Sequence, residues 1–221
     1  MRLDKSLAER SLVEVVDLLN GNRLVGLGFR LLDGAIATSC RCLPRPRGEV
    51  VFPDPDLPGI LVLVRVRLPG TEKAASGIVT AADPHSGLAL LESATATGLT
   101  APDELNPIIP IEKLIAELES TDPALSPREG GRVFVCTEER SWVECNAGPS
   151  TIAVGSPGRL GHATVGAPAF DDDGRVVGVV TSVAEDGLRG GLCRLSEHLP
   201  GWALRRAAAR AHGLSSNSSR L

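Results

Sequence analysis

The sequence predicts an all-β protein, built either as one large domain or as two small barrels that share a core. Short apolar runs with strand character recur at intervals of roughly 8–12 residues, which is typical of a barrel or a sandwich. Pairs such as Asn20-Gly21 and Asp33-Gly34 separate these runs and favour tight hairpin turns. The chain has 221 residues, of which 43% are hydrophobic, so it is long enough to bury a sizeable core.

The first half of the chain is expected to supply six strands, which suffice for one barrel. In Ser11–Leu18 the apolar spacing also suits a helix, but its β-branched valines and the Asn-Gly turn that follows favour a strand. The stretch from Pro44 to Pro58 is rich in proline, aspartate and arginine and is expected to form a loop, and residues 1–10 a short helix or a frayed arm. The other five strands are predicted at Leu24–Leu32, Ala35–Ser39, Ile60–Leu68, Ala74–Ala81 and Leu88–Ser93.

The second half begins after a connection that contains five prolines. Its middle, Ile111–Ser120, has apolar residues at helical spacing and is expected to be a short, solvated helix. An Asp-Gly turn at 171–174 predicts a hairpin between Ala169-Phe170 and Val176–Ser182. Further strands are predicted at Arg132–Thr137, Ser141–Asn146, Ser150–Val154 and Gly191–Leu195, and a helix at Trp202–His212. We therefore expect an N-terminal barrel over residues 1–93, a linker with a short helix over 94–127, a C-terminal barrel over 128–200, and a helix with a mobile tail over 201–221.

Charge and composition narrow the function classes. The net charge of −4 argues against nonspecific nucleic-acid binding, because no excess of basic residues neutralises phosphates. The N-terminal residues MRLDKSLAER lack the apolar core of a signal peptide, and no run approaches the ~18 apolar residues of a membrane span. Five cysteines, an odd number without an export signal, predict reduced thiols. We expect a cytoplasmic protein that binds neither nucleic acid nor membrane; the sequence leaves its oligomeric state open.

Three separated stretches resemble the trypsin-like serine proteases, in the family's order, within about residues 11–200. GFRLLDGAIATSCRCL, starting at Gly28, resembles a G-F strand, a turn and a T-A-A-H-C-L segment in which the histidine is the general base. DPHSGLALL, starting at Asp83, resembles the D-L-A-L-L strand whose aspartate orients that histidine. ATVGAP, starting at Ala163, resembles the G-x-S-G-G-P nucleophile loop. The resemblance implies two six-stranded antiparallel β-barrels with a short linker helix, a C-terminal helix and a cleft between the barrels.

The same resemblance places Arg41, Gly87 and Val165 at the positions of the family's histidine, aspartate and serine. Arginine carries only donors and stays protonated, so Arg41 cannot act as a general base. Gly87 has no side chain to orient a base, and Val165 has no nucleophilic atom. The family's glycine two residues before the serine is replaced by Ala163, which alters the oxyanion loop. A pseudoprotease is therefore expected, with a peptide or protein partner in its cleft and Arg41 favouring an acidic group.

Two alternatives remain open. The first is an active serine endopeptidase-like hydrolase with relocated groups, in which Thr164 is a shifted nucleophile and His85 or His162 a base. These three residues, together with Arg41, are the candidate cleft-binding residues. The second alternative is a structural or oligomerisation domain that docks a partner through its basic C-terminal helix, which carries Arg205, Arg206 and Arg210.

Cys40 and Cys42 flank Arg41 and raise the question of a metal site. A Cys-x-Cys pair without a second ligand pair at suitable spacing is a weak zinc signal, so both are expected to be small buried hydrophobes. No metal and no cofactor are therefore expected. In many secreted relatives the cysteine after the base is bridged to the preceding strand. Because Leu24–Leu32 contains no cysteine, the resemblance implies that this bridge is missing here.

Overall fold

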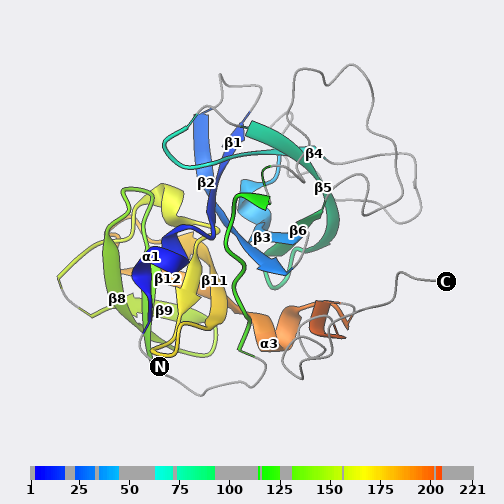
Figure 1. Ribbon diagram of the computed structural model, residues 1–221. Helices are drawn as coiled ribbons and strands as arrows, with labels where there is room; N and C mark the ends of the chain where they lie inside the picture. Colours follow the sequence, from blue (N-terminus) through cyan, green and yellow to red (C-terminus); the bar gives the residue numbers. More distant parts are fainter. Residues whose placement is uncertain are drawn as a thin grey trace, which may run out of the picture.

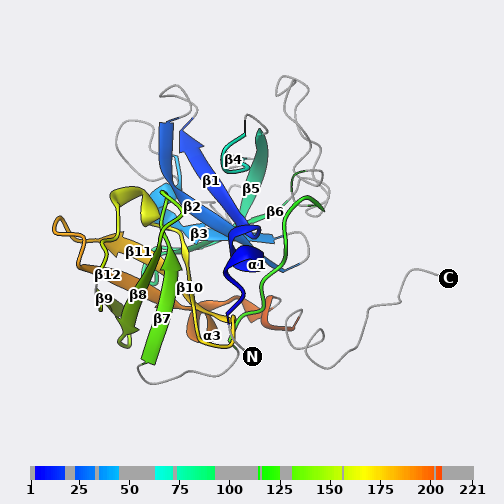
Figure 2. The same ribbon diagram turned by 60° about the vertical axis from the view of Figure 1, so that its left-hand side comes forward.

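The structure is a computed structural model that describes residues 3–17, 23–32, 35–44, 63–71, 74–92, 114, 116–124, 131–155, 157–201 and 203–205. Two closed six-stranded antiparallel barrels form its body and pack against each other (Figures 1 and 2). The all-β double-barrel prediction is therefore confirmed.

The first barrel closes in the order β1-β2-β3-β6-β5-β4. Within the predicted segment Ser11–Leu18, residues Leu12–Asp17 form a strand (β1) rather than a helix, as the β-branched valines predict, and β1 pairs with both β2 and β4. Asn20-Gly21, Asp33-Gly34 and most of the predicted loop from Pro44 to Pro58 lie outside the described residues. The strands are β1 (Leu12–Asp17), β2 (Arg23–Leu32), β3 (Ala35–Ser39), β4 (Leu63–Arg67), β5 (Ala74–Asp83) and β6 (Leu88–Glu92).

The second barrel closes in the order β10-β11-β12-β9-β8-β7. The predicted hairpin at 171–174 is present: the Asp171 N–H donates to the Arg175 carbonyl (2.9 Å), and Gly174 adopts φ +80°. Only glycine adopts such a left-handed conformation without a steric cost. The strands are β7 (Gly131–Cys136), β8 (Trp142–Ala147), β9 (Thr151–Val154), β10 (Pro168–Phe170), β11 (Val176–Val183) and β12 (Arg189–Arg194).

The buried apolar residues form three clusters, one of which lies between the barrels. One fills the first barrel around Val13, and a second fills the other barrel around Val135. The third lies between the barrels, where Phe29 of β2 and Phe170 of β10 belong to the same buried cluster. Burying apolar side chains at this seam favours a fixed arrangement of the barrels, so a site formed by residues from both can be preorganised.

The N-terminal helix α1 (Lys5–Glu9) contacts the second barrel before the chain enters the first. It begins at Asp4, whose carboxylate accepts a hydrogen bond from the Leu7 N–H (3.1 Å). At its other end Glu9 accepts a hydrogen bond from Trp142 Nε1 of β8 (2.6 Å). Ala8 is buried in the cluster between the barrels.

The connection between the barrels is partly described. Leu114 and Ala116 are helical, in the predicted segment, but Leu114 and Leu118 are buried in the core cluster of the first barrel. The expectation of a solvated helix is therefore wrong for these two residues, because the apolar stripe packs on a barrel. Further along, the Thr121 N–H donates to the Arg30 carbonyl and the Ala124 N–H to the Val176 carbonyl, so the connection bonds to both barrels.

Beyond β12 the chain forms α3 (Leu195–His198), and residues 201 and 203–205 are helical within the predicted C-terminal helix. Arg206, Arg210 and the predicted tail lie outside the described residues. Within the described part of the chain, helices are too short or too polar to cross a lipid bilayer. All five cysteines are buried and unbridged.

Candidate functional site

Arg41 lies in η1 (Cys40–Cys42), a 3-10 turn that directly follows β3. The turn begins at Ser39, whose hydroxyl accepts a hydrogen bond from the Arg41 N–H (3.2 Å). Cys40 and Cys42 are buried, as expected, while the Arg41 side chain is exposed. Burial is the main cause that raises the pKa of Cys40 to about 11, so this thiol stays protonated near neutral pH. The turn therefore buries its two thiols and presents the guanidinium.

Gly87 lies in the turn between β5 and β6, directly against η1. Its carbonyl accepts a hydrogen bond from the Cys40 N–H (2.7 Å), which fixes the turn beside the Arg41 position. Its φ of +78° is left-handed, and a Cβ at this position would lie 3.0 Å from Cγ2 of Thr181 in β11. Conformation and space thus both favour glycine here.

Val165 follows a second 3-10 turn, η4 (His162–Thr164). Its carbonyl accepts a hydrogen bond from the Leu27 N–H of β2 (2.7 Å), and the next residue, Gly166, donates to the Val180 carbonyl of β11 (2.7 Å). Gly166 has φ +89°, and a Cβ there would overlap the Leu27 carbonyl. These bonds hold the Val165 loop between the two barrels.

Two residues of η4, Ala163 and Thr164, were candidates for the oxyanion loop and for a shifted nucleophile. Ala163 has a negative φ, since Arg140 is the one described residue other than glycine with a positive value. Thr164 has no exposed surface. Its hydroxyl donates to the Glu138 carboxylate and accepts from the Gly161 N–H (3.0 Å). The structure therefore places Thr164 inside the protein rather than at the surface of a binding site.

A cavity of about 630 Å³ brings several of these positions together. Arg41 and Val165 share its wall with His162 and Ala163. We call it the arginine cavity, because Arg23, Arg41 and Arg65 line it. The valines and leucines of its wall come from both barrels and are Val16, Leu24, Val25, Leu43, Leu63, Val64, Val165 and Val183.

Two smaller hollows each share one wall residue with the arginine cavity. The first, of about 280 Å³, has Arg41, His85 and Gly87 in its wall and is called the His85 hollow. The other, of about 230 Å³, shares His162 with the arginine cavity. It is called the acidic hollow because Glu138, Glu139, Glu185 and Asp186 line it, together with Arg159. Of the candidate residues at the triad, oxyanion-loop and cleft positions, all except Thr164 thus line the arginine cavity or the His85 hollow.

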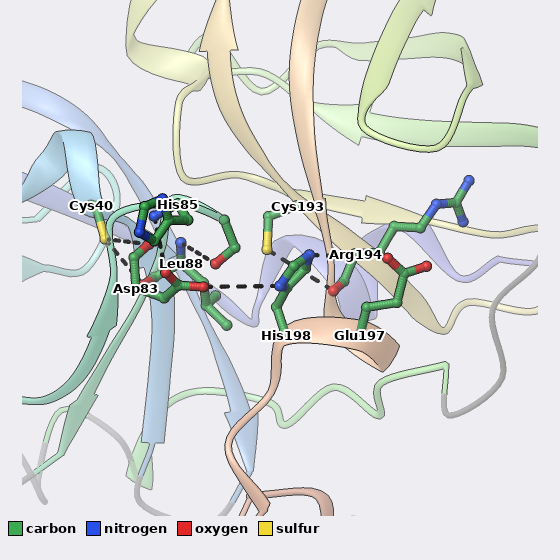
Figure 3. A network of polar contacts seen from close by, with 9 residues as sticks. Cys40, Asp83, His85, Leu88, Cys193, Arg194, Glu197 and His198 are labelled. Atoms are coloured by element: carbon green, nitrogen blue, oxygen red, sulfur yellow. Dashed lines mark hydrogen bonds and ion pairs between the residues drawn. The ribbon is translucent and has the colours of Figure 1, made fainter.

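His85 belongs to a polar network that reaches the second barrel (Figure 3). Its backbone N–H donates to Asp83 Oδ1 (2.9 Å), and Asp83 Oδ2 lies 3.9 Å from Nδ1 of His198 in α3. The Ser86 hydroxyl, followed by backbone N–H groups and the charge of His198, holds the pKa of Asp83 below its ordinary value of 3.8. The carboxylate therefore stays ionised at neutral pH and takes part in a contact between the barrels.

Sequence reasoning missed the contributions of Arg23, Arg65 and Glu138. The alternation of β4 places Arg65 and Arg67 on the same face, but it does not show that only Arg65 lines the cavity. Glu138 follows β7 and carries no local signal, because its partner Thr164 is 26 residues away. Among the described residues, no group of three or more histidine, cysteine, aspartate or glutamate side chains is placed to hold a metal ion.

No family model and no curated protein matches the sequence. Among solved structures, the chain is similar to the serine endoprotease from Yersinia pestis, with a TM-score of 0.55 and 13% identity over 90% of this chain. The match spans 65% of the Y. pestis chain. It is also similar to the active form of the Rv3671c protease from M. tuberculosis, with a TM-score of 0.52 and 17% identity over 87% of this chain and 79% of that one. At such identities a structural likeness shows the fold and not the activity. The chain thus has the double β-barrel fold of the trypsin-like serine proteases.

Proposed function

We propose that this protein is a pseudoprotease, which binds a peptide or protein segment between its barrels without cutting it. The observation that carries the proposal is that Arg41 and Val165, at the general-base and nucleophile positions, line one and the same cavity. Acyl transfer of the trypsin-like kind requires a general base and a nucleophilic hydroxyl or thiol in hydrogen-bond reach of each other. A guanidinium and an isopropyl group supply neither function.

The surroundings of the two positions support the same conclusion. Gly87, at the orienting position, has a left-handed φ and faces Thr181, so an acidic side chain has no unstrained place there. Thr164, the candidate for a shifted nucleophile, is fully buried and its hydroxyl donates to Glu138. Loss of a whole triad leaves at most ~10³–10⁴-fold acceleration over water in an otherwise intact serine protease.

The size and lining of the cavity support binding. Ligand sites are concave, mostly apolar and have volumes of about 300–1,000 Å³, with a few polar groups that orient the ligand. The arginine cavity, of about 630 Å³, fits this description. It shares Arg41 with the His85 hollow and His162 with the acidic hollow. Several hollows with common wall residues suit an extended chain better than a compact ligand.

The competing proposal is an active hydrolase with relocated groups. It predicts turnover that depends on Thr164, His85 or His162. We would incubate the purified protein with a diverse peptide mixture and identify the products by mass spectrometry, with trypsin as positive control. We expect no cleavage by the wild-type protein. Cleavage that disappears in Thr164→Ala, His85→Ala or His162→Ala would overturn the proposal.

A second arm tests binding. The immobilised protein is exposed to the same mixture, and retained peptides are eluted and identified. We expect intact peptides to be retained by the wild type and lost in Leu24→Trp, because an indole at this half-buried position fills the cavity. Leu188→Trp is the matched control, since Leu188 is exposed and lies outside the cavity wall. Equal retention by both variants contradicts binding at this site.

A further inference from the structure

The charge of the arginine cavity is one-sided. Arg23, Arg41 and Arg65 line it, and Asp17 is the one acidic residue among its described lining residues. His162 adds a further positive charge only when it is protonated. A cluster of guanidinium groups in a concave, partly apolar wall concentrates positive potential, which favours an anionic group on the ligand.

Arg65 is the residue whose environment most clearly indicates an anion. It lies on β4, and its Nε is buried without a hydrogen-bond acceptor among the described residues. Two residues further along the same strand, Arg67 donates from Nε to the Glu14 carboxylate (2.8 Å). A buried donor without an acceptor is costly, and such groups in native structures call for a partner that is not part of the chain. Among the described residues, Arg67 thus has a carboxylate partner and the Arg65 Nε has no acceptor.

The acidic hollow, which shares His162 with the arginine cavity, has the opposite charge. Among its described lining residues, Arg159 is the one arginine or lysine, against Glu138, Glu139, Glu185 and Asp186. A carboxylate on a bound peptide is therefore attracted to the arginine cavity and repelled from its neighbour. The charge of the wall thus changes from positive to negative on passing His162, which lines both spaces. This difference favours one position in the cleft for an acidic residue of the peptide.

We propose that the arginine cavity is the binding site for a carboxylate on a peptide segment, with apolar side chains of that segment against the valine and leucine wall. Arg65, Arg23 and Arg41 supply the charge, and guanidinium groups suit carboxylates because they donate paired, parallel hydrogen bonds. The inference deepens the proposed function and rests on it in one respect, namely that a peptide occupies this cleft.

The test uses isothermal titration calorimetry with short synthetic peptides whose ends are blocked. One has Leu-Glu-Leu at its centre, a second Leu-Gln-Leu and a third Leu-Lys-Leu. A fourth has the Leu-Gln-Leu centre and a free C-terminal carboxylate. Comparing it with the Glu peptide shows whether the site prefers a side-chain carboxylate or a chain terminus. We expect at least one of the two carboxylate peptides to bind about tenfold or more tightly than the blocked Gln peptide, because charge-assisted hydrogen bonds exceed neutral ones.

Two variants on one strand supply the control. Arg65→Gln keeps a polar side chain but removes the charge, and is expected to abolish the preference for the carboxylate. Arg67→Gln removes an arginine that is already paired with Glu14 and does not line the cavity, and is expected to keep the preference. Thermal unfolding of both variants verifies that they are folded. The preference is also expected to weaken as salt is raised.

The inference is overturned if neither carboxylate peptide binds more tightly than the blocked Gln peptide, or if Arg67→Gln loses the preference as fully as Arg65→Gln. Mass spectrometry of the titrated samples keeps the two proposals apart. Cleaved peptides would contradict the noncatalytic function, while a carboxylate preference that depends on Arg65 would still establish the anion site. Intact peptides without any such preference would contradict the anion site alone.

Discussion

The hydroxyl of Thr164 donates a hydrogen bond to the carboxylate of Glu138, which joins the loop before Val165 to the turn after β7. The same hydroxyl accepts from the Gly161 N–H, so one buried side chain satisfies two partners and closes the η4 turn. Buried hydrogen bonds whose partners are all satisfied make a loop more rigid. A structural role in this loop therefore explains Thr164 without any catalytic role.

The first prediction concerns this hydroxyl. Thr164→Val keeps the shape of the side chain but leaves the Glu138 carboxylate and the Gly161 N–H without their partner. We expect a loss of about 1–3 kcal/mol in the free energy of unfolding, measured in urea. Thr151→Val, at an exposed position on β9, is the control and is expected to change stability by less than about 0.5 kcal/mol. Equal stability of the two variants would mean that the Thr164 hydrogen bonds contribute nothing.

The second prediction separates backbone strain from crowding at Gly87. Gly87 and Gly174 have nearly the same left-handed φ, +78° and +80°. A Cβ at Gly174 would meet its nearest neighbour, Leu3, at 3.7 Å, whereas one at Gly87 would meet Thr181 at 3.0 Å. We expect Gly174→Ala to cost about 1–2 kcal/mol and Gly87→Ala about 2–4 kcal/mol, because only the latter adds overpacking to strain.

Thr181→Ser supplies the internal check, because it removes the methyl group that a Cβ at position 87 would approach most closely. In that background the cost of Gly87→Ala, from the same chemical unfolding experiment, is expected to fall toward that of Gly174→Ala. If the excess cost persists, crowding by Thr181 is not its cause. A reduced cost in turn identifies the obstacle that an acidic side chain would meet at position 87.

Much of the fold could be predicted because its signals are local. The valines of Leu12–Asp17 and the Asp-Gly pair ending at Gly174 specify a strand and a hairpin through propensity and backbone conformation. The helical stripe with Leu114 and Leu118 was also visible, but not that it packs on the first barrel, since burial depends on a partner that periodicity does not identify. A local pattern cannot supply such a partner.

The candidate site was less predictable than the fold, because its residues are brought together by contacts that a local pattern does not identify. The resemblance to trypsin-like motifs identifies Arg41 and Val165 as neighbours, and the structure lines one cavity with both. It does not identify Arg65, because strand alternation assigns Arg65 and Arg67 the same face, and only the three-dimensional position of Glu14 separates them. A contact between Glu138 and Thr164 likewise depends on how β7 lies against the loop before Val165.

The third prediction is a pH dependence that originates at Asp83. The Ser86 hydroxyl is the largest cause of the lowered pKa of Asp83, so this carboxylate stabilises the folded state above its ordinary pKa of 3.8. That contribution is lost as the pH falls through the lower pKa of the folded state. Ser86→Ala removes the main cause and brings the folded and unfolded pKa values closer together.

We expect the melting temperature of Ser86→Ala to lie below that of the wild type at neutral pH, and the difference to narrow as the pH falls below 3.8. Differential scanning calorimetry from about pH 7 to about pH 2 covers the range. Ser150→Ala, in the exposed turn before β9, is the control and should show no pH-dependent difference. A difference for Ser86→Ala that stays constant with pH would assign the effect to something other than the ionisation of Asp83.

The fourth prediction concerns the thiols. Burial is the main cause that raises the pKa of Cys40 and Cys145 to about 11, and that of Cys136 and Cys193 to about 12. The thiolate is the form that attacks an alkylating agent, and its fraction at about pH 8 is then about one part in a thousand or less. We expect the folded protein, treated with iodoacetamide at that pH, to gain no mass from these four residues while glutathione in the same solution reacts.

The unfolded protein is the matching control and tests the missing bridge as well. All five cysteines are free, so unfolding in urea without any reductant should expose five reactive thiols and add five carbamidomethyl groups. An intact mass with three adducts would instead indicate one disulfide, and peptide mapping would identify its two cysteines. Rapid labelling of the folded chain at Cys193 would contradict its burial beside Ser86, and with it the packing of β12 against the turn that holds Gly87.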